Sequence, residues 1–448
     1  LNQAGVSADE VVGVAVDGTS CTVVACEADG TPLRPAILWM DQRAHQEAGA
    51  ITASKHPILK YVSWQESPEW MIPKAWWLSK NEPDVYRRAA LIIEETDWLT
   101  HKLTGRWTAS LCNVTCKWNY ARPEGGWPVG LLEEIGLVSL LEKWPQEVLP
   151  MGSVAGELTS EAGDALGLKA GIPVAEGGID AYAAMLGVGV VRPGRMALVM
   201  GSSTCHMALC DRAIFESHVW GPYPDALLEG TWVLEGGQTA TGSIVDWLAD
   251  NFGYREELEA QRAGRNRFEL LDEKAAAVPP GAQGLLVLDY WQGNRTPIRD
   301  PLARGVIVGL TLSHGIGHVL RAIYEGTAMG TRHILQDLAQ AGFTAEGIYA
   351  CGGGTRSELW LQIHADVCQV PIYVTAVPEA TALGTAMCAA VAAGLFDDLV
   401  AAAETMVTIK REVAPNPDHQ PVYDALFGKY IDAYPALKDI MHHLAKSS

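Results

Sequence analysis

Residues 197–209, ALVMGSSTCHMAL, decide the fold, because they place a loop of small polar residues between two apolar runs. This pattern predicts two short strands joined by a tight turn at 201–205. A similar unit, VAVDGTSCTVV, occupies residues 14–24. Any tight turn favours Gly, Ser and Thr, so this likeness could be chance, but it suggests two similar domains that face each other across a cleft.

The chain is long enough for two domains. Its 448 residues exceed what one hydrophobic core usually serves. Predicted strands alternate with predicted helices, which favours α/β sheets over a helical bundle or a β-sandwich. The segment VVRPG at 190–194 is the best boundary. We therefore expect α/β domains at residues 1–192 and 193–448.

Individual elements follow from local periodicity. Between residues 10 and 39 the sequence predicts three short strands, VVGVAV, TVVAC and AILW. Residues 72–104 follow a helical pattern that Gly105 closes. After the boundary we expect a helical block at 314–341 and a strand at 347–351.

Charge and cysteine usage restrict the partners and the compartment. A net charge of −20 without a basic block would repel nucleic acid and anionic membranes. No apolar run reaches the roughly 18 residues of a membrane span. The 9 cysteines are odd in number and lie mostly in apolar runs, which predicts buried thiols in a reducing, cytoplasmic compartment. Cys112 and Cys116 have the spacing of two metal ligands, but nothing nearby completes a site, so we predict no metal-binding residues.

Three segments could carry chemistry. The turn GSSTC at 201–205 could present backbone N–H groups to phosphates, or be an ordinary hairpin. The loop GGGTRSE at 352–358 follows a predicted strand and opens a helix, so it could approach a nucleotide or be only a glycine-rich turn. In EGGIDAYAAMLG at 176–187, Asp180 is placed to accept a proton from a hydroxyl. Its alternative role is a helix N-cap.

The segment GVIVGLTLSHGIGHVLRAIYE at 305–325 has the pattern of a family signature: a glycine-framed apolar start, a spacer, then His, Ala, an aromatic residue and an acid. KAWWLSKN at 74–81 meets a second signature in part, with Ala75 in place of a larger apolar residue. With the three segments above, the chain resembles the FGGY carbohydrate kinases over nearly its whole length.

This resemblance implies a fold, a cofactor and site residues. We expect two actin/hexokinase-like (ribonuclease H-like) α/β domains that flank a catalytic cleft and close over ATP, Mg²⁺ and a sugar. Asp180 matches the catalytic base, which would also contact the sugar. The predicted nucleotide contacts are Gly201, Ser202, Ser203, Thr204, Gly242, Gly352, Gly353 and Gly354.

Within the family, the chain looks most like pentulose kinases of the D-ribulokinase type. That likeness rests on the segments ILWMDQRA, SLCNVTCKWNY, MGSSTCHMAL, VWGPY, EGGQTATG and GNRTPIRDP. It implies phosphorylation of a sugar hydroxyl, most simply of D-ribulose. Xylulose, L-ribulose or a polyol such as erythritol remain alternative acceptors, and a non-catalytic sugar-sensing module remains an alternative function. The expected partner is a small-molecule sugar, and a homodimer is left open.

The loop DGTSC at 17–21 looks like the family's first phosphate loop, yet the residues after it match a later segment whose preceding turn contacts sugar. We therefore predict a sugar-side role for Asp17, Thr19, Ser20 and Trp39. The first phosphate hairpin and about 60–80 residues are then expected to precede Leu1. On this interpretation the first domain lacks its N-terminal hairpin, and the chain as given would be a poor kinase.

Overall fold

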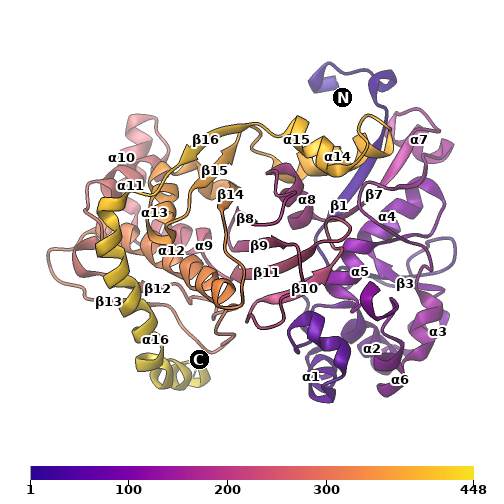
Figure 1. The fold of residues 1–448 in the computed structure, drawn as a ribbon, viewed down its shortest axis with the longest axis horizontal. Helices are drawn as coiled ribbons and strands as arrows, with labels where there is room; N and C mark the ends of the chain where they lie inside the picture. The colour runs from indigo at the N-terminus through magenta and orange to yellow at the C-terminus, as the bar shows by residue number, and fades with distance from the viewer. Residues whose placement is uncertain (1, 448) are drawn as a thin grey trace.

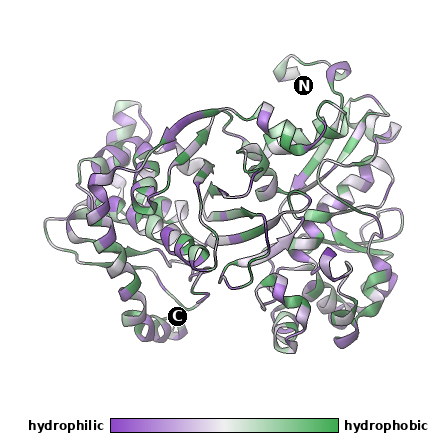
Figure 2. Cartoon of the chain, viewed as in Figure 1, coloured by the Kyte–Doolittle hydropathy of each residue, from purple (hydrophilic) through white to green (hydrophobic). Residues whose placement is uncertain are grey.

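The computed structural model describes residues 2–447, which form two α/β units side by side (Figure 1). Hydrophobic residues follow the strands, and hydrophilic residues are frequent on outer helices such as α10 (Tyr254–Ala263) and α11 (Arg267–Ala276) (Figure 2). Apolar strands covered by amphipathic helices are the arrangement expected of α/β domains.

The N-terminal unit is built on a small sheet in the order β1 (Val14–Gly18), β7 (Pro173–Ile179) and β6 (Val154–Glu157). β1 and β7 run parallel, so their carboxyl ends, at Gly18 and Ile179, lie at the same edge of the sheet. Two further strand pairs complete this unit: β2 (Val23–Cys26) with β3 (Leu91–Glu94), and β4 (Ala109–Ser110) with β5 (Val148–Leu149).

The C-terminal unit contains a seven-stranded sheet. Its order is β10 (Trp220–Pro224), β11 (Trp232–Gln238), β9 (Thr204–Cys210), β8 (Arg195–Met200), β14 (Gly347–Cys351), β15 (Ile372–Thr375) and β16 (Ile409–Val413). β8, β14 and β15 are parallel, whereas the outer strands are antiparallel. A separate pair joins β12 (Leu286–Leu288) to β13 (Val306–Val308).

Both faces of this sheet are buried. Met196, Leu198 and Met200 of β8 belong to one core, with residues of α9, α12 and α13, whereas Ala197 between them belongs to the other core, with residues of α8 and α14. This alternation is the two-residue period of a strand. Helices therefore cover the sheet on both sides, as parallel strands require.

The remaining α-helices lie in both units, together with short 3-10 helices. Their bounds are α1 (His45–Ser54), α2 (Met71–Asn81), α3 (Pro83–Arg88), α4 (Glu95–Thr104), α5 (Leu111–Lys117), α6 (Val129–Glu134), α7 (Ser160–Leu166), α8 (Asp180–Gly187), α9 (Gly242–Phe252), α12 (Ile316–Gln340), α13 (Glu358–Cys368), α14 (Ala380–Ala392), α15 (Leu399–Met406) and α16 (Gln420–Ser447). Within residues 2–447, none of them combines the length and hydrophobicity that crossing a membrane requires.

The chain returns to the N-terminal unit near its end. α14 and α15 lie beside α8 and β1 (Figure 1), and their buried residues belong to the N-terminal core. The helices α8 and α14 approach closely, because a Cβ on Gly384 would collide with the carbonyl oxygen of Ala183. Residues 380–406 therefore pack as part of the N-terminal unit, although they follow the predicted boundary at 192/193.

Several local expectations are confirmed, including the helix at 316–340 and the strand at 347–351. Others are wrong. Residues 14–24 are not a hairpin, because β1 pairs in parallel with β7 while β2 pairs with β3 in a different sheet. The helical pattern of 72–104 is interrupted by the strand β3. AILW contributes only an isolated bridge between Ile37 and Val23. The local pattern of apolar residues shows which side chains are buried, but it does not show with which other strand a strand pairs.

Candidate active site

The turn at Gly201–Ser203 joins β8 to β9 and packs against the start of α9. The carbonyl oxygen of Ser202 accepts hydrogen bonds from the backbone N–H groups of Thr241 (2.9 Å) and Ser243 (3.1 Å). Gly242 must be glycine, because a Cβ there would collide with the carbonyl oxygen of Gly201. Gly201, Ser202 and Ser203 are exposed, whereas Thr204 is buried, with its hydroxyl 2.9 Å from that of Thr241. Thr204 therefore links the turn to the residue that precedes α9.

The glycine loop at 352–354 lies beside this turn, because the two loops follow the paired parallel strands β14 and β8. Together the two loops line a cavity of about 470 Å³, to which Gly201, Ser202, Gly242, Gly353 and Gly354 all contribute. A Cβ on Gly353 would meet nothing within 4 Å, so this glycine borders open space. The structure thus brings together most of the predicted nucleotide contacts, while Ser203, Thr204 and Gly352 lie outside the lining of this cavity.

Aromatic side chains form part of the same cavity's wall. Tyr324 and Trp360 stack with ring centroids 4.9 Å apart at 15°, and Phe268 also lines the space. The hydroxyl of Tyr324 donates to Asp272 (2.6 Å), which fixes the ring. Flat apolar rings beside glycine backbone are suited to hold a nucleotide's base.

Asp180 lies at the junction of β7 and α8, where charges of both units, Lys117 and Glu235, act on it. Its Oδ1 accepts a hydrogen bond from the backbone N–H of Ala181 (2.6 Å). Burial raises the pKa of Asp180, and the negative charges of Asp17 and Glu235 raise it further, against the opposing effects of that N–H and of Lys117. A raised pKa suits a general base that must hold a proton during the reaction.

An ion pair that sequence reasoning missed joins the two units near Asp180. Lys117 at the end of α5 lies 3.4 Å from Glu235 of β11, and their side chains are only 9 % and 13 % exposed. Burial is the largest single effect and would lower the pKa of Lys117, but the charge and hydrogen bond of Glu235, together with Cys116, raise it. The signals were a single charged residue, Lys117, among the uncharged residues 107–120 and the repetition of Glu-Gly-Gly at 176–178 and 235–237.

Buried polar atoms surround this ion pair. The hydroxyls of Tyr182 and Tyr223 and the indole N–H of Trp220 have no hydrogen-bond partner among the described residues. The charge of Glu235 raises the pKa of both tyrosines after the larger effect of burial. Unpaired buried donors are costly unless a ligand satisfies them. The arrangement therefore suits a ligand that carries several hydroxyl groups.

The predicted sugar-side loop lies at the carboxyl end of β1. Oδ2 of Asp17 accepts a hydrogen bond from the hydroxyl of Thr385 on α14 (2.5 Å). Thr19 is exposed, whereas the side chain of Ser20 interacts with the buried carboxyl of Glu94. The Trp39 side chain is 39 % exposed. The structure thus brings Asp17 into the electrostatic range of Asp180 and turns Ser20 toward the interior.

Lys74, within the partial signature at 74–81, holds this region together. Its ammonium group is buried and donates to the carbonyl oxygens of Cys21 (2.7 Å), Leu38 (2.8 Å) and Trp39 (3.2 Å). These bonds tie the DGTSC loop to the segment that carries Trp39. Sequence reasoning used Lys74 only as part of a motif and missed this role.

Comparisons with known proteins agree with this geometry. Residues 1–187 match the N-terminal domain, and residues 196–393 the C-terminal domain, of the FGGY family of carbohydrate kinases. A ribulokinase of Shouchella clausii is 36 % identical over 95 % of this chain and 81 % of its own length. An FGGY carbohydrate kinase domain-containing protein of Xenopus laevis is 33 % identical over 95 % of this chain and 83 % of its own.

Solved structures extend the likeness to the fold. The xylulose kinase of Rhodospirillum rubrum superposes with a TM-score of 0.82 at 30 % identity, over 96 % of this chain and 85 % of its own. The predicted fold and enzyme class are confirmed. The chain is therefore a sugar kinase with two actin/hexokinase-like domains, and it belongs to the FGGY family of carbohydrate kinases.

Proposed function

We propose that this kinase transfers the γ-phosphoryl group of ATP to a hydroxyl of a pentulose, with ribulose as the preferred acceptor. The single observation that carries the proposal is the junction of Asp180 with the buried Lys117–Glu235 pair, which supplies a base and polar partners for a polyhydroxylated ligand. The names of the relatives support the acceptor class, since one is called a ribulokinase and another a xylulose kinase.

Asp180 acts as the general base in this proposal. Its free carboxylate oxygen removes the proton from the acceptor's primary hydroxyl. At the same time the hydroxyl oxygen bonds to the γ-phosphorus, and the bond from the γ-phosphorus to the β–γ bridging oxygen breaks. Lys117 and Glu235 hold the sugar's other hydroxyls, which fixes the attacking oxygen in line. Because the two residues come from different units, they contact the sugar together only when the cleft is closed.

The nucleotide contacts follow from the cavity of about 470 Å³. FGGY kinases use ATP as the phosphate donor. The backbone N–H groups of the turn at 201–203 and of Gly353 would hold its phosphates, and the Tyr324–Trp360 stack would lie beside its base. Mg²⁺ would fit near Asp17 and Asp180, because their carboxylates interact at the ends of adjacent strands. When bound, this cation neutralises phosphate charge.

An acceptor screen tests the proposal. ATP consumption is coupled to NADH oxidation with D-ribulose, L-ribulose, D-xylulose and erythritol as separate acceptors, and kcat/KM is compared. We expect a pentulose to give the highest value and the Asp180→Asn variant to lose turnover with every acceptor. A polyol preferred over all three pentuloses would contradict the acceptor class. Binding of pentuloses without turnover would favour a sugar-sensing module.

A further inference from the structure

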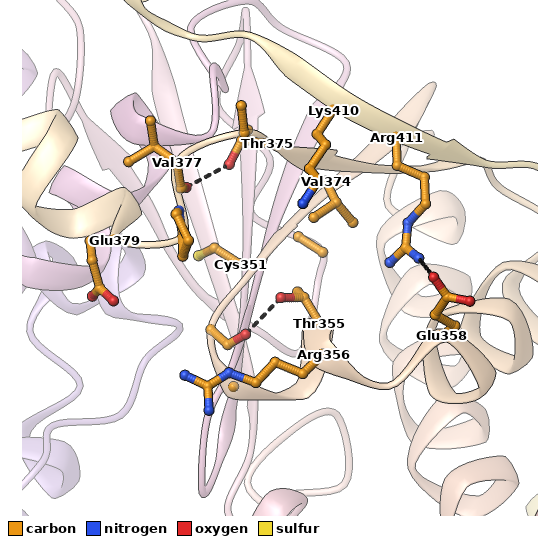
Figure 3. A pocket seen from close by; sticks show the side chains of 15 residues that line it. Cys351, Thr355, Arg356, Glu358, Val374, Thr375, Val377, Glu379, Lys410 and Arg411 are labelled. Atoms are coloured by element: carbon orange, nitrogen blue, oxygen red, sulfur yellow. Dashed lines mark hydrogen bonds and ion pairs between the residues drawn. The ribbon is translucent and has the colours of Figure 1, made fainter. Parts of the chain in front are cut away.

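A second cavity, of about 830 Å³, lies at the carboxyl ends of the parallel strands β14 and β15 (Figure 3). It shares Gly353 and Arg356 with the nucleotide cavity, and its other lining residues are different. Ligands of open α/β sheets bind at the carboxyl ends of the strands. The volume lies within the range of small-molecule sites, which is about 300–1,000 Å³.

Three cationic side chains line this second cavity. Lys410 and Arg411 of β16 and Arg356 of the glycine loop line it, and Figure 3 shows the Lys410 and Arg411 side chains descending from β16 toward its interior. Arg411 bonds to Glu358 at 2.7 Å. For Arg356 and Lys410, by contrast, no ion-pair partner lies among residues 2–447. In a chain of net charge −20, two free cations at one cavity attract an anionic group.

Oxygen atoms complete the lining. The hydroxyl of Thr355 donates to the carbonyl oxygen of Gly352 (2.8 Å), and that of Thr375 donates to Val377 (3.1 Å), so each retains lone pairs that can accept. The carboxylate of Glu379 lies across the cavity from Lys410 in Figure 3. A cavity lined by both cations and acceptor oxygens suits a ligand that carries an anionic group and hydroxyl groups.

We propose that this second cavity binds a sugar phosphate, the chemical class of the enzyme's own product. The identity of the sugar rests on the proposed function. Inorganic phosphate alone would leave most of the volume and most of the acceptor oxygens unused. Because Gly353 and Arg356 belong to both cavities, a sugar phosphate bound here changes the surroundings of the nucleotide, so the amount of product modulates nucleotide affinity.

Calorimetry on the whole chain tests this site. The catalytic cleft is first filled with saturating ribulose and a non-hydrolysable ATP analogue, and ribulose 5-phosphate or inorganic phosphate is then titrated. We expect ribulose 5-phosphate to bind and inorganic phosphate to bind at least tenfold more weakly. Lys410→Gln should lower the affinity for ribulose 5-phosphate by about tenfold, as the loss of one charge-assisted hydrogen bond predicts. Lys55→Gln, an exposed lysine of the N-terminal unit, is the matched control and should bind as the parent does.

Two results would overturn the proposal: equal affinity of the parent and Lys410→Gln, or inorganic phosphate that binds as tightly as ribulose 5-phosphate. A failure of the proposed function looks different. In that case no pentulose is turned over in the acceptor screen, while the Lys410-dependent binding persists and supports the second cavity by itself. Unchanged melting temperatures of both lysine variants exclude misfolding as the cause of any loss.

Discussion

Replacing Asp180 by Asn separates a role as base from a structural role at the start of α8. Asp180 is not the N-cap that the sequence offered as its alternative role, because Ile179 holds that position and Asp180 is the first residue of the helix. The hydrogen bond from the Ala181 N–H to Oδ1, at 2.6 Å, can be kept by the asparagine carbonyl oxygen. A residue with only this structural role would therefore leave kcat unchanged. If Asp180 is the base, kcat should fall by about 10²–10⁴-fold, the usual contribution of a positioned general base. Nucleotide affinity measured without Mg²⁺ should stay within about threefold, because Asp180 lies outside the nucleotide cavity.

Stability provides the second measurement. A carboxyl whose pKa is raised on folding contributes stability below its unfolded pKa, and that contribution is lost as the pH rises through the folded pKa. At pH 7.5 the Asn variant avoids this loss, so its Tm should equal or exceed that of the parent. In the parent, kcat should decline as the pH falls through the raised pKa of Asp180. Asp164→Asn, on the exposed face of α7, serves as the control. If Asp180→Asn kept the kcat of the parent, the assignment of Asp180 as base would be refuted. If its Tm were lowered, a loss of turnover would be due to a damaged structure.

Three further predictions concern the rest of the cleft and the interior. Glu235→Gln leaves Lys117 buried without its counter-charge, so the KM for the acceptor should rise at least about tenfold while the KM for ATP stays within about twofold. Steady-state kinetics with each substrate varied measure both values, and a parallel rise of the two KM values would contradict the prediction. Gly242→Ala should displace the turn at Gly201 and weaken ADP binding in calorimetry, whereas Gly428→Ala, whose Cβ meets nothing within 4 Å, should not; an unchanged Kd in the first variant would remove the turn from the nucleotide site. Burial raises the pKa of Glu66 from 4.5 to about 8, so the stability that its neutral form contributes is lost as the pH rises across that window. Between pH 5 and 8.5 the Tm should therefore fall less steeply with pH in Glu66→Gln than in the parent. Parallel slopes would show that Glu66 does not cause the fall in Tm.

The sequence was strongest where chemistry is local. Glycine loops after apolar strands, and an aspartate at a strand-to-helix junction, are short-range patterns, and the structure brings Gly201, Gly242 and Gly353 to one cavity with Asp180 at the nearby cleft. Backbone conformation and residue size suffice for such predictions, because neighbouring residues determine them.

Pairing across the chain could not be obtained in this way. The two similar loops at 17–21 and 201–205 have different environments. The loop at 201–205 joins the two strands of a hairpin, whereas the loop at 17–21 connects strands of two different sheets. Lys74 is an ordinary lysine of an amphipathic helix until the fold places three carbonyl oxygens from two loops around its ammonium group.

The sequence by itself therefore determined the family, the α/β class, the small-residue loops and the catalytic aspartate as a candidate. Only the tertiary structure decided that Lys117 and Glu235 meet across the cleft, that α14 joins the N-terminal core, and that Arg356 and Lys410 border one cavity. The physical reason is range. Periodicity and turn chemistry act over a few residues, whereas an ion pair between positions 117 and 235 forms only after both units have folded and their desolvated surfaces have come together.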